Sequence, residues 1–100
     1  IHAQYLKVFF HQDYLLKHIE QKFDWILSNP PFHQGKQTDY TITARFFAES
    51  VKKLNRDGKL LLIVNDFLDY ESQLRQLFNH VECLQRQAGF KLLFCRGPKK

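Results

Sequence analysis

The run KLLLIVN at residues 59–65 most constrains what this chain can fold into. It holds five consecutive aliphatic residues and is too short for an ordinary helix. A strand with one solvent-exposed face alternates apolar and polar residues, whereas a strand covered on both faces is apolar throughout. The run therefore predicts a central strand of a parallel sheet.

The flanking segments alternate between strand and helix patterns. In chain order they predict strands at 6–13 and 23–29, a helix at 38–55, the central strand, a short helix at 69–78, and strands at 81–87 and 90–96. A helical turn is also expected within 14–22, and a turn at Gly58. Ala88-Gly89 predicts a terminal hairpin that adds one antiparallel strand at a sheet edge. The expected fold is α/β with a mostly parallel sheet.

Length and composition indicate one small domain. The chain has 100 residues, of which 44% are hydrophobic, and no run resembles a membrane span or a signal peptide. A cytoplasmic protein that does not engage a membrane is expected. Because methionine is absent throughout, we expect the chain to be a piece of a longer polypeptide.

Charge and cysteine spacing limit which partners and metal sites are expected. The net charge of +5 favours nucleic acid, although part of the excess lies in the tail RGPKK. Cys83 and Cys95 stand far apart in apolar runs, without the spacing of a metal site. We expect two free thiols and no metal.

The stretch SNPPFHQ at 28–34 carries the functional signal. Ligands of open α/β sheets bind at the carboxyl ends of strands, and Asn29 ends the predicted strand 23–29. Pro30 and Pro31 stiffen the loop that follows, because proline fixes φ and has no N–H. The plain alternative is a turn that stops the strand.

A stiff loop at this place presents hydrogen-bond acceptors. The Asn29 amide oxygen and the Pro30 carbonyl can orient an exocyclic amino group and direct its lone pair at an electrophile without a charged base. Phe32 can stack on the ring that carries the amine, which contributes roughly 1–3 kcal/mol per base. This chemistry predicts a site for an aromatic amine.

The motif also carries a family resemblance. FDWILSNPPFH resembles the Asn/Asp/Ser-Pro-Pro-aromatic motif of class I S-adenosylmethionine-dependent amino methyltransferases. The longer string NPPFHQGKQT is similar to ribosomal RNA guanine-N2 methyltransferases of the small-subunit methyltransferase C type. LLLIVNDFLDY and GFKLLF resemble later strands of that family. The resemblance runs from about Val8 to Phe94 and implies a partial Rossmann-like methyltransferase fold.

The resemblance implies roles for named residues. Asn29, Pro30, Pro31 and Phe32 would form the catalytic motif that holds the guanine N2 amine. Asp13 and Tyr14, with Asn29, would contact S-adenosylmethionine. The expected residues facing ribosomal RNA are Phe32, His33, Gln34, Lys36, Gln37 and Asn65. Asp13 as a turn cap, His33 as an ordinary loop histidine and Asn65 as a strand end are the structural alternatives.

The chain departs from the family pattern in one respect, which limits what residues 1–100 are expected to do alone. The glycine-rich loop G-x-G that would hold the cofactor is missing, and the four glycines lie elsewhere. Residues 1–100 therefore resemble the C-terminal portion of a methyltransferase domain. The upstream half is expected to be required, and the isolated chain is expected to be inactive.

Two other functions remain open from the sequence. The Asn-Pro-Pro-Phe motif is shared with enzymes that methylate adenine N6 in DNA or a protein glutamine. Only the extension FHQGKQT distinguishes the guanine-N2 methyltransferases from these enzymes. A non-catalytic RNA-binding remnant is the second alternative. The sequence favours methylation of guanine N2 in small-subunit (16S) ribosomal RNA, with ribosomal RNA or the small subunit as partner.

Overall fold

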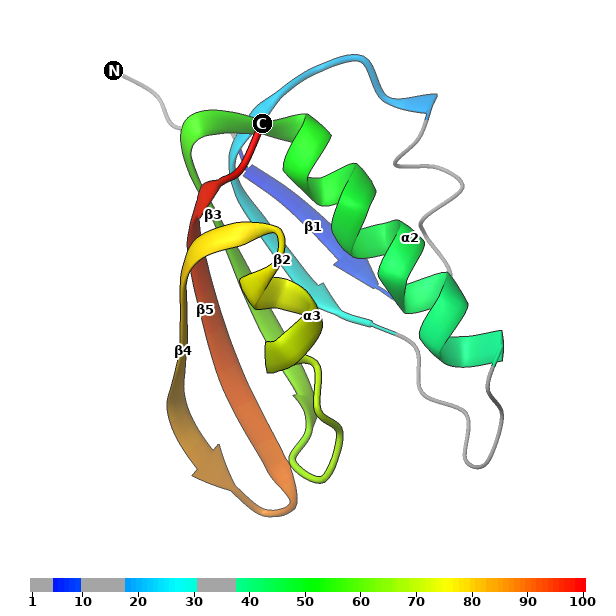
Figure 1. The fold of residues 1–100 in the computed structure, drawn as a ribbon, viewed down its shortest axis with the longest axis vertical. Coiled ribbons are helices and arrows are strands. Elements are labelled where there is room, and N and C mark those ends of the chain that lie inside the picture. Colours follow the sequence, from blue (N-terminus) through cyan, green and yellow to red (C-terminus); the bar gives the residue numbers. More distant parts are fainter. Residues whose placement is uncertain (1–4, 10–17, 31–37) are drawn as a thin grey trace.

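A computed structural model of the chain describes residues 5–9, 18–30 and 38–100, and the side chains of residues 18–30 and 43–100. Figure 1 labels its elements. They are β1 (Tyr5–Phe9), β2 (Phe23–Asn29), α2 (Thr38–Lys53), β3 (Leu54–Asn65), α3 (Glu71–Arg75), β4 (Phe78–Gln87) and β5 (Phe90–Pro98). Apart from its last residues, the helical turn expected at 14–22 lies outside the described residues.

The strands form one five-stranded sheet in the order β1-β2-β3-β5-β4. β1, β2 and β3 are parallel neighbours, while β5 is antiparallel to both β3 and β4. The predicted α/β fold, with a mostly parallel sheet and a C-terminal antiparallel hairpin, is confirmed.

The prediction that the antiparallel strand lies at an edge is wrong. β5 lies inside the sheet, between β3 and β4. Its inward residues Leu93 and Cys95 are fully buried, whereas the polar strand β4 occupies the edge. Apolar side chains on β5 gain most by packing in the middle of the sheet.

The boundary between the central helix and strand also differs from the prediction. α2 ends at Lys53, and Leu54 opens β3 with its side chain fully buried. The turn predicted at Gly58 is not found, because Gly58 lies within β3; a Cβ there would come within 2.9 Å of the Asn55 carbonyl oxygen. Burial of Leu54 against the sheet has overridden its fit to the helical pattern.

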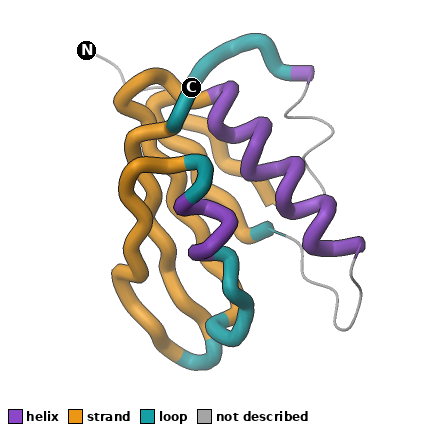
Figure 2. The backbone as a smooth tube through the Cα atoms, in the orientation of Figure 1, coloured by secondary structure: helices purple, strands orange, loops and turns teal. Residues whose placement is uncertain are grey.

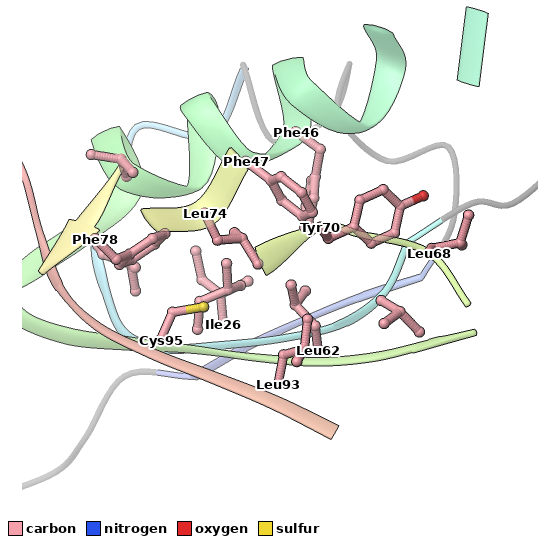
Figure 3. Close-up of a cluster of buried hydrophobic side chains, with 14 of the residues drawn as sticks. Ile26, Phe46, Phe47, Leu62, Leu68, Tyr70, Leu74, Phe78, Leu93 and Cys95 are labelled. Carbon is pink, nitrogen blue, oxygen red and sulfur yellow. The ribbon is translucent and has the colours of Figure 1, made fainter. Parts of the chain in front are cut away.

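The core lies between the sheet and the two helices. Figures 1 and 2 show α2 and α3 on the same side of the strands, and Figure 3 shows the buried side chains between them. Leu60, Leu62 and Val64 of β3 point into this layer, together with Phe47 of α2 and Leu74 of α3. Burial raises the pKa of the Cys95 thiol to about 12, so this thiol stays protonated at neutral pH.

The opposite side of the sheet is called the outer face below. Its residues alternate with the buried ones along each strand. The apolar ones are Trp25, Leu27, Leu61, Ile63, Phe90, Leu92 and Phe94, and the polar ones include Asn29, Asn65 and Arg96. Ile63 is 50% exposed and Phe90 is 44% exposed. In the described part of the chain both helices lie on one side, so the prediction of two covered faces for 59–65 holds for one face only.

Candidate functional site

Two asparagines end neighbouring parallel strands. Asn29 closes β2 and Asn65 closes β3. Leu27 pairs with Leu61 and Ser28 with Leu62, so β3 continues about two residues beyond the level of Asn29. Residue alternation places both asparagine side chains on the outer face. The carboxyl edge of the sheet therefore carries two neutral amides on the same face.

The residues at the end of β2 differ in burial. Asn29 is exposed, whereas Pro30 is buried. Burial of the Pro30 ring fixes the backbone directly after Asn29. The Ser28 hydroxyl is buried and has no hydrogen-bond partner in the described parts of the chain. An anchored backbone with an exposed amide beside it can present that amide to a ligand in a defined orientation.

Most of the other predicted site residues lie outside the described residues. These are Asp13, Tyr14, Pro31, Phe32, His33, Gln34, Lys36 and Gln37. Phe9, the last residue of β1, pairs with Asn29, so β1 and β2 end at the same edge of the sheet. The roles assigned to these residues stay predictions.

The β3–α3 loop, residues 66–70, forms the neighbouring part of this edge. The Asp66 amide donates to the Gly89 carbonyl over 2.9 Å, and the Leu68 amide donates to the Asn65 carbonyl over 3.2 Å. Tyr70 is buried and meets Phe47 of α2 edge-on, with ring centroids 5.5 Å apart. The loop is therefore tied to the hairpin turn and to the long helix.

A carboxylate stabilises the start of α3. Asp69 accepts hydrogen bonds from the Ser72 hydroxyl over 2.9 Å and from the Ser72 amide over 3.2 Å. These bonds, chiefly that of the hydroxyl, lower the pKa of the Asp69 carboxyl. The pair fixes the direction in which the chain leaves the β3–α3 loop.

A buried ion pair also anchors this loop, and the sequence analysis did not predict it. The Lys91 ammonium lies 2.8 Å from Glu71, with side chains only 4% and 14% exposed. Lys91 stands on β5 opposite Val64, and Glu71 is the first residue of α3. The sequence signal was a single lysine in the apolar run FKLLF, at a position that faces the core.

Among residues 18–30 and 38–100 there is no group of three or more His, Cys, Asp or Glu side chains that could hold a metal ion. In the same part of the chain, no helix combines the length and apolarity needed to cross a membrane.

Comparison with known proteins identifies the family. The sequence model of the methyltransferase small domain matches residues 2–94. The chain belongs to the methyltransferase small domain family. The family resemblance seen in the sequence is thereby confirmed.

Curated relatives point to one branch of this family. The chain is 44% identical over 77 residues to a ribosomal RNA small subunit methyltransferase C of Psychromonas ingrahamii, covering 77% of this chain and 22% of that protein. A Haemophilus influenzae protein of the same name is 42% identical over 74 residues, which cover 74% of this chain and 22% of that protein. The chain thus spans about a fifth of the length of these relatives.

Solved structures agree with the fold. A T. thermophilus 16S rRNA N2 methyltransferase in complex with AdoMet and guanosine matches with a TM-score of 0.65 and 32% identity, over 77% of this chain and 20% of that one. A methyltransferase from Pyrococcus furiosus matches with a TM-score of 0.56 and 22% identity, over 81% of this chain and 44% of that one. The second likeness supports the fold alone.

Proposed function

We propose that this small-domain methyltransferase chain supplies the target-amine part of an enzyme that methylates guanine N2 in small-subunit ribosomal RNA. The observation that carries the proposal is the exposed Asn29 amide at the carboxyl end of β2, on the buried anchor Pro30. The T. thermophilus neighbour, which is 32% identical, is in complex with AdoMet and guanosine. Its ligands are the cofactor and nucleoside that the proposal requires.

The proposed mechanism is direct attack by the amine. The Asn29 side-chain oxygen and the Pro30 carbonyl accept hydrogen bonds from the two N2–H groups and turn the nitrogen lone pair toward the methyl group. Phe32 stacks on the guanine and limits its rotation. S-adenosylmethionine, when bound, would supply an electrophilic methyl group and leave as S-adenosylhomocysteine, and the methylated nitrogen then loses one proton to water. Positioning is the main source of rate, because neutral acceptors suffice for an amine that becomes cationic only as it reacts.

The remaining predicted residues line the two sides of this centre. Asp13 and Tyr14, on the chain that follows β1, would contact the cofactor, with Asn29 between cofactor and base. Asn29 fits this place because its exposed amide offers both a donor and an acceptor. On the RNA side we place His33, Gln34, Lys36, Gln37 and Asn65. Asn65 lies on the same face as Asn29, which suits contact with the same guanine.

The proposed enzyme needs a second part. None of the four glycines of residues 1–100 stands in a G-x-G loop, so we infer that the upstream half of a methyltransferase is required for cofactor binding and that residues 1–100 alone are inactive. Because its substrate is ribosomal, we place the enzyme in the cytoplasm.

A methyl-transfer assay tests the substrate class. Residues 18–100 are substituted for the matching segment of the 44% identical relative, and the chimera is supplied with S-adenosylmethionine labelled in its methyl group. Label is expected in RNA of small ribosomal subunits, and neither in DNA nor in protein. Residues 1–100 alone serve as the control and should transfer no label. Label in DNA or protein, or none in RNA, contradicts the proposal.

A further inference from the structure

We propose that a basic cleft, at the opposite end of the sheet from Asn29, binds backbone phosphates of the substrate RNA. The basic cleft has a volume of about 580 Å³, and its lining includes Lys22, Arg56, Asn79, Lys99 and Lys100. Four of the 15 lysines and arginines of the chain therefore gather at one place, and no acidic residue of the described ranges lines it. The inference rests on the proposed function, because that function makes the ligand an RNA.

The basic cleft lies where β2, β3 and β4 begin and β5 ends. Phe23, the first residue of β2, pairs with Leu54, the first residue of β3. Phe78, the first residue of β4, pairs with Pro98, the last residue of β5. Figure 1 shows the C-terminal end of the chain beside the start of β3. Segments that are far apart in the sequence therefore bring their charges to one edge of the sheet.

An irregularity in β3 displaces Arg56 from the regular ladder. Where β2 advances by two residues, β3 advances by five, from Leu54 to Lys59. Residues 55–58 thus form a bulge, and bulges redirect side chains at the edges of sheets. Arg56 is exposed, so its guanidinium can reach a ligand.

Backbone carbonyls hold two of the lysines in place. The Lys99 amide donates to the Leu77 carbonyl over 2.8 Å, and the Lys99 ammonium donates to the Arg75 carbonyl over 3.0 Å. The Lys100 ammonium donates to the Leu54 carbonyl. Because an ammonium has three N–H donors, each of these lysines has donors left for a phosphate. The cations are therefore positioned before a ligand binds, which lowers the entropy cost of binding.

Gly97 allows Asn79 to lie in the lining of the basic cleft. The φ of Gly97 is +70°, and a Cβ there would come within 3.1 Å of the Asn79 Cβ atom. The Asn79 carboxamide supplies N–H donors without adding charge. The basic cleft thus combines charged and neutral hydrogen-bond donors.

Repulsion among the cations favours a bound anion. Burial, and after it the nearby Lys22 ammonium, lower the pKa of the Lys100 amino group. Both effects disfavour the charged form, and a phosphate between the two ammonium groups would oppose them. The arrangement therefore gains stability from an anionic ligand.

The lining suits the backbone of a nucleic acid rather than its bases. Lys, Arg and Asn side chains are common ligands of nucleic-acid phosphates, and arginine can bind a phosphate through two N–H groups. No aromatic side chain of the described ranges lines the basic cleft, so it offers no ring on which a base could stack. An acidic polypeptide would also satisfy the cations, but the proposed substrate already carries a phosphate at every nucleotide.

The distance to the proposed site calls for an extended ligand. Six strand steps of about 3.3 Å separate Phe23 from Asn29, so the basic cleft lies roughly 20 Å from the target amine. A phosphate bound there belongs to a nucleotide other than the target guanine. Such a contact orients the RNA without reading its sequence.

Fluorescence anisotropy tests RNA binding by residues 1–100, which contain every residue named in the lining. The probe is a fluorescein-labelled oligouridylate of about 16 nucleotides, titrated at several salt concentrations. Lys22→Gln combined with Arg56→Gln is expected to weaken binding roughly 2- to 30-fold. It should also reduce the slope of log affinity against log salt by about 1.4, because each phosphate contact to a single strand contributes about 0.7.

Two control variants match this double substitution. Arg45→Gln with Arg86→Gln removes the same charge from exposed positions on α2 and β4, and should weaken binding less than about 2-fold because salt screens distant charges. Lys22→Arg with Arg56→Lys keeps both charges and should keep the salt slope. Since all four side chains are exposed, the melting temperatures of the variants should agree with that of the wild type within about 2 °C.

Three results would each overturn the proposal. Wild-type residues 1–100 might bind no RNA, or the two double glutamine variants could weaken binding equally. In the third, polyglutamate of matched length binds as tightly as the RNA, which would make an acidic polypeptide the ligand. Because the readout is binding, a failure to methylate guanine leaves this result intact and counts only against the proposed function.

Discussion

Asn29→Ala is expected to lower kcat by roughly 10- to 150-fold in the chimeric enzyme, with little change in KM for RNA. The Asn29 oxygen bonds an amine that gains positive charge as the methyl group transfers. The bond therefore strengthens in the transition state, and loss of such an interaction appears in kcat. A charge-assisted hydrogen bond of this kind contributes about 1.5–3 kcal/mol.

Single-turnover methylation distinguishes a role of Asn29 in the chemical step from a purely structural role. Asn55→Ala is the matched control, because Asn55 bonds Asp24 over 2.9 Å at the opposite end of the sheet. It should leave the chemical rate unchanged. Phe32→Ala should impair both KM and kcat, since stacking exists in the ground state as well. If Asn29→Ala keeps the wild-type rate, the Asn-Pro-Pro-Phe segment merely stops a strand.

Lys91→Met is expected to lower the free energy of unfolding of residues 1–100 by about 3–5 kcal/mol. The substitution leaves the Glu71 carboxylate, 14% exposed, without the ammonium that lies 2.8 Å away. Removal of one partner of a buried ion pair costs far more than removal of both. This loss is a large share of the stability of a small domain.

The double variant Lys91→Met with Glu71→Met isolates the cause. Since a buried ion pair is often no better than apolar side chains of similar size, the double variant should regain most of the lost stability. Urea denaturation of the three proteins gives the comparison. A loss below about 1 kcal/mol in Lys91→Met would show that Glu71 finds water or another partner.

The elements that could be predicted from sequence are those whose pattern is local. The aliphatic run of β3 and the periodic apolar face of α2 each carry their signal within one segment. The position of β5 does not, because it depends on which strand of the hairpin finds the larger apolar surface. The Lys91–Glu71 pair joins residues 20 positions apart and forms only when α3 folds over the sheet, so that Glu71 reaches Lys91 of β5. Leu54 fits the helical spacing but packs as a strand residue.

The candidate site likewise has parts that a local sequence pattern predicts and parts that depend on tertiary packing. Asn29 and Asn65 were predicted at strand ends, and the structure places them at the carboxyl edge of neighbouring strands. That both lie on the outer face follows from the pairing of Leu27 with Leu61, which no single strand encodes. The anchoring of the β3–α3 loop by Tyr70 and Phe47 likewise depends on tertiary packing.

The position of the transferred methyl group decides whether the site at Asn29 acts on guanine N2. The chimera methylates small-subunit RNA with deuterated methyl from S-adenosylmethionine, the RNA is digested to nucleosides, and these are separated by liquid chromatography with mass spectrometry. The heavy methyl group is expected in N2-methylguanosine, and Asn29→Ala should lower its rate of formation by the same factor as the single-turnover rate. A heavy methyl on adenine N6, or N2-methylguanosine at an undiminished rate in Asn29→Ala, would contradict it.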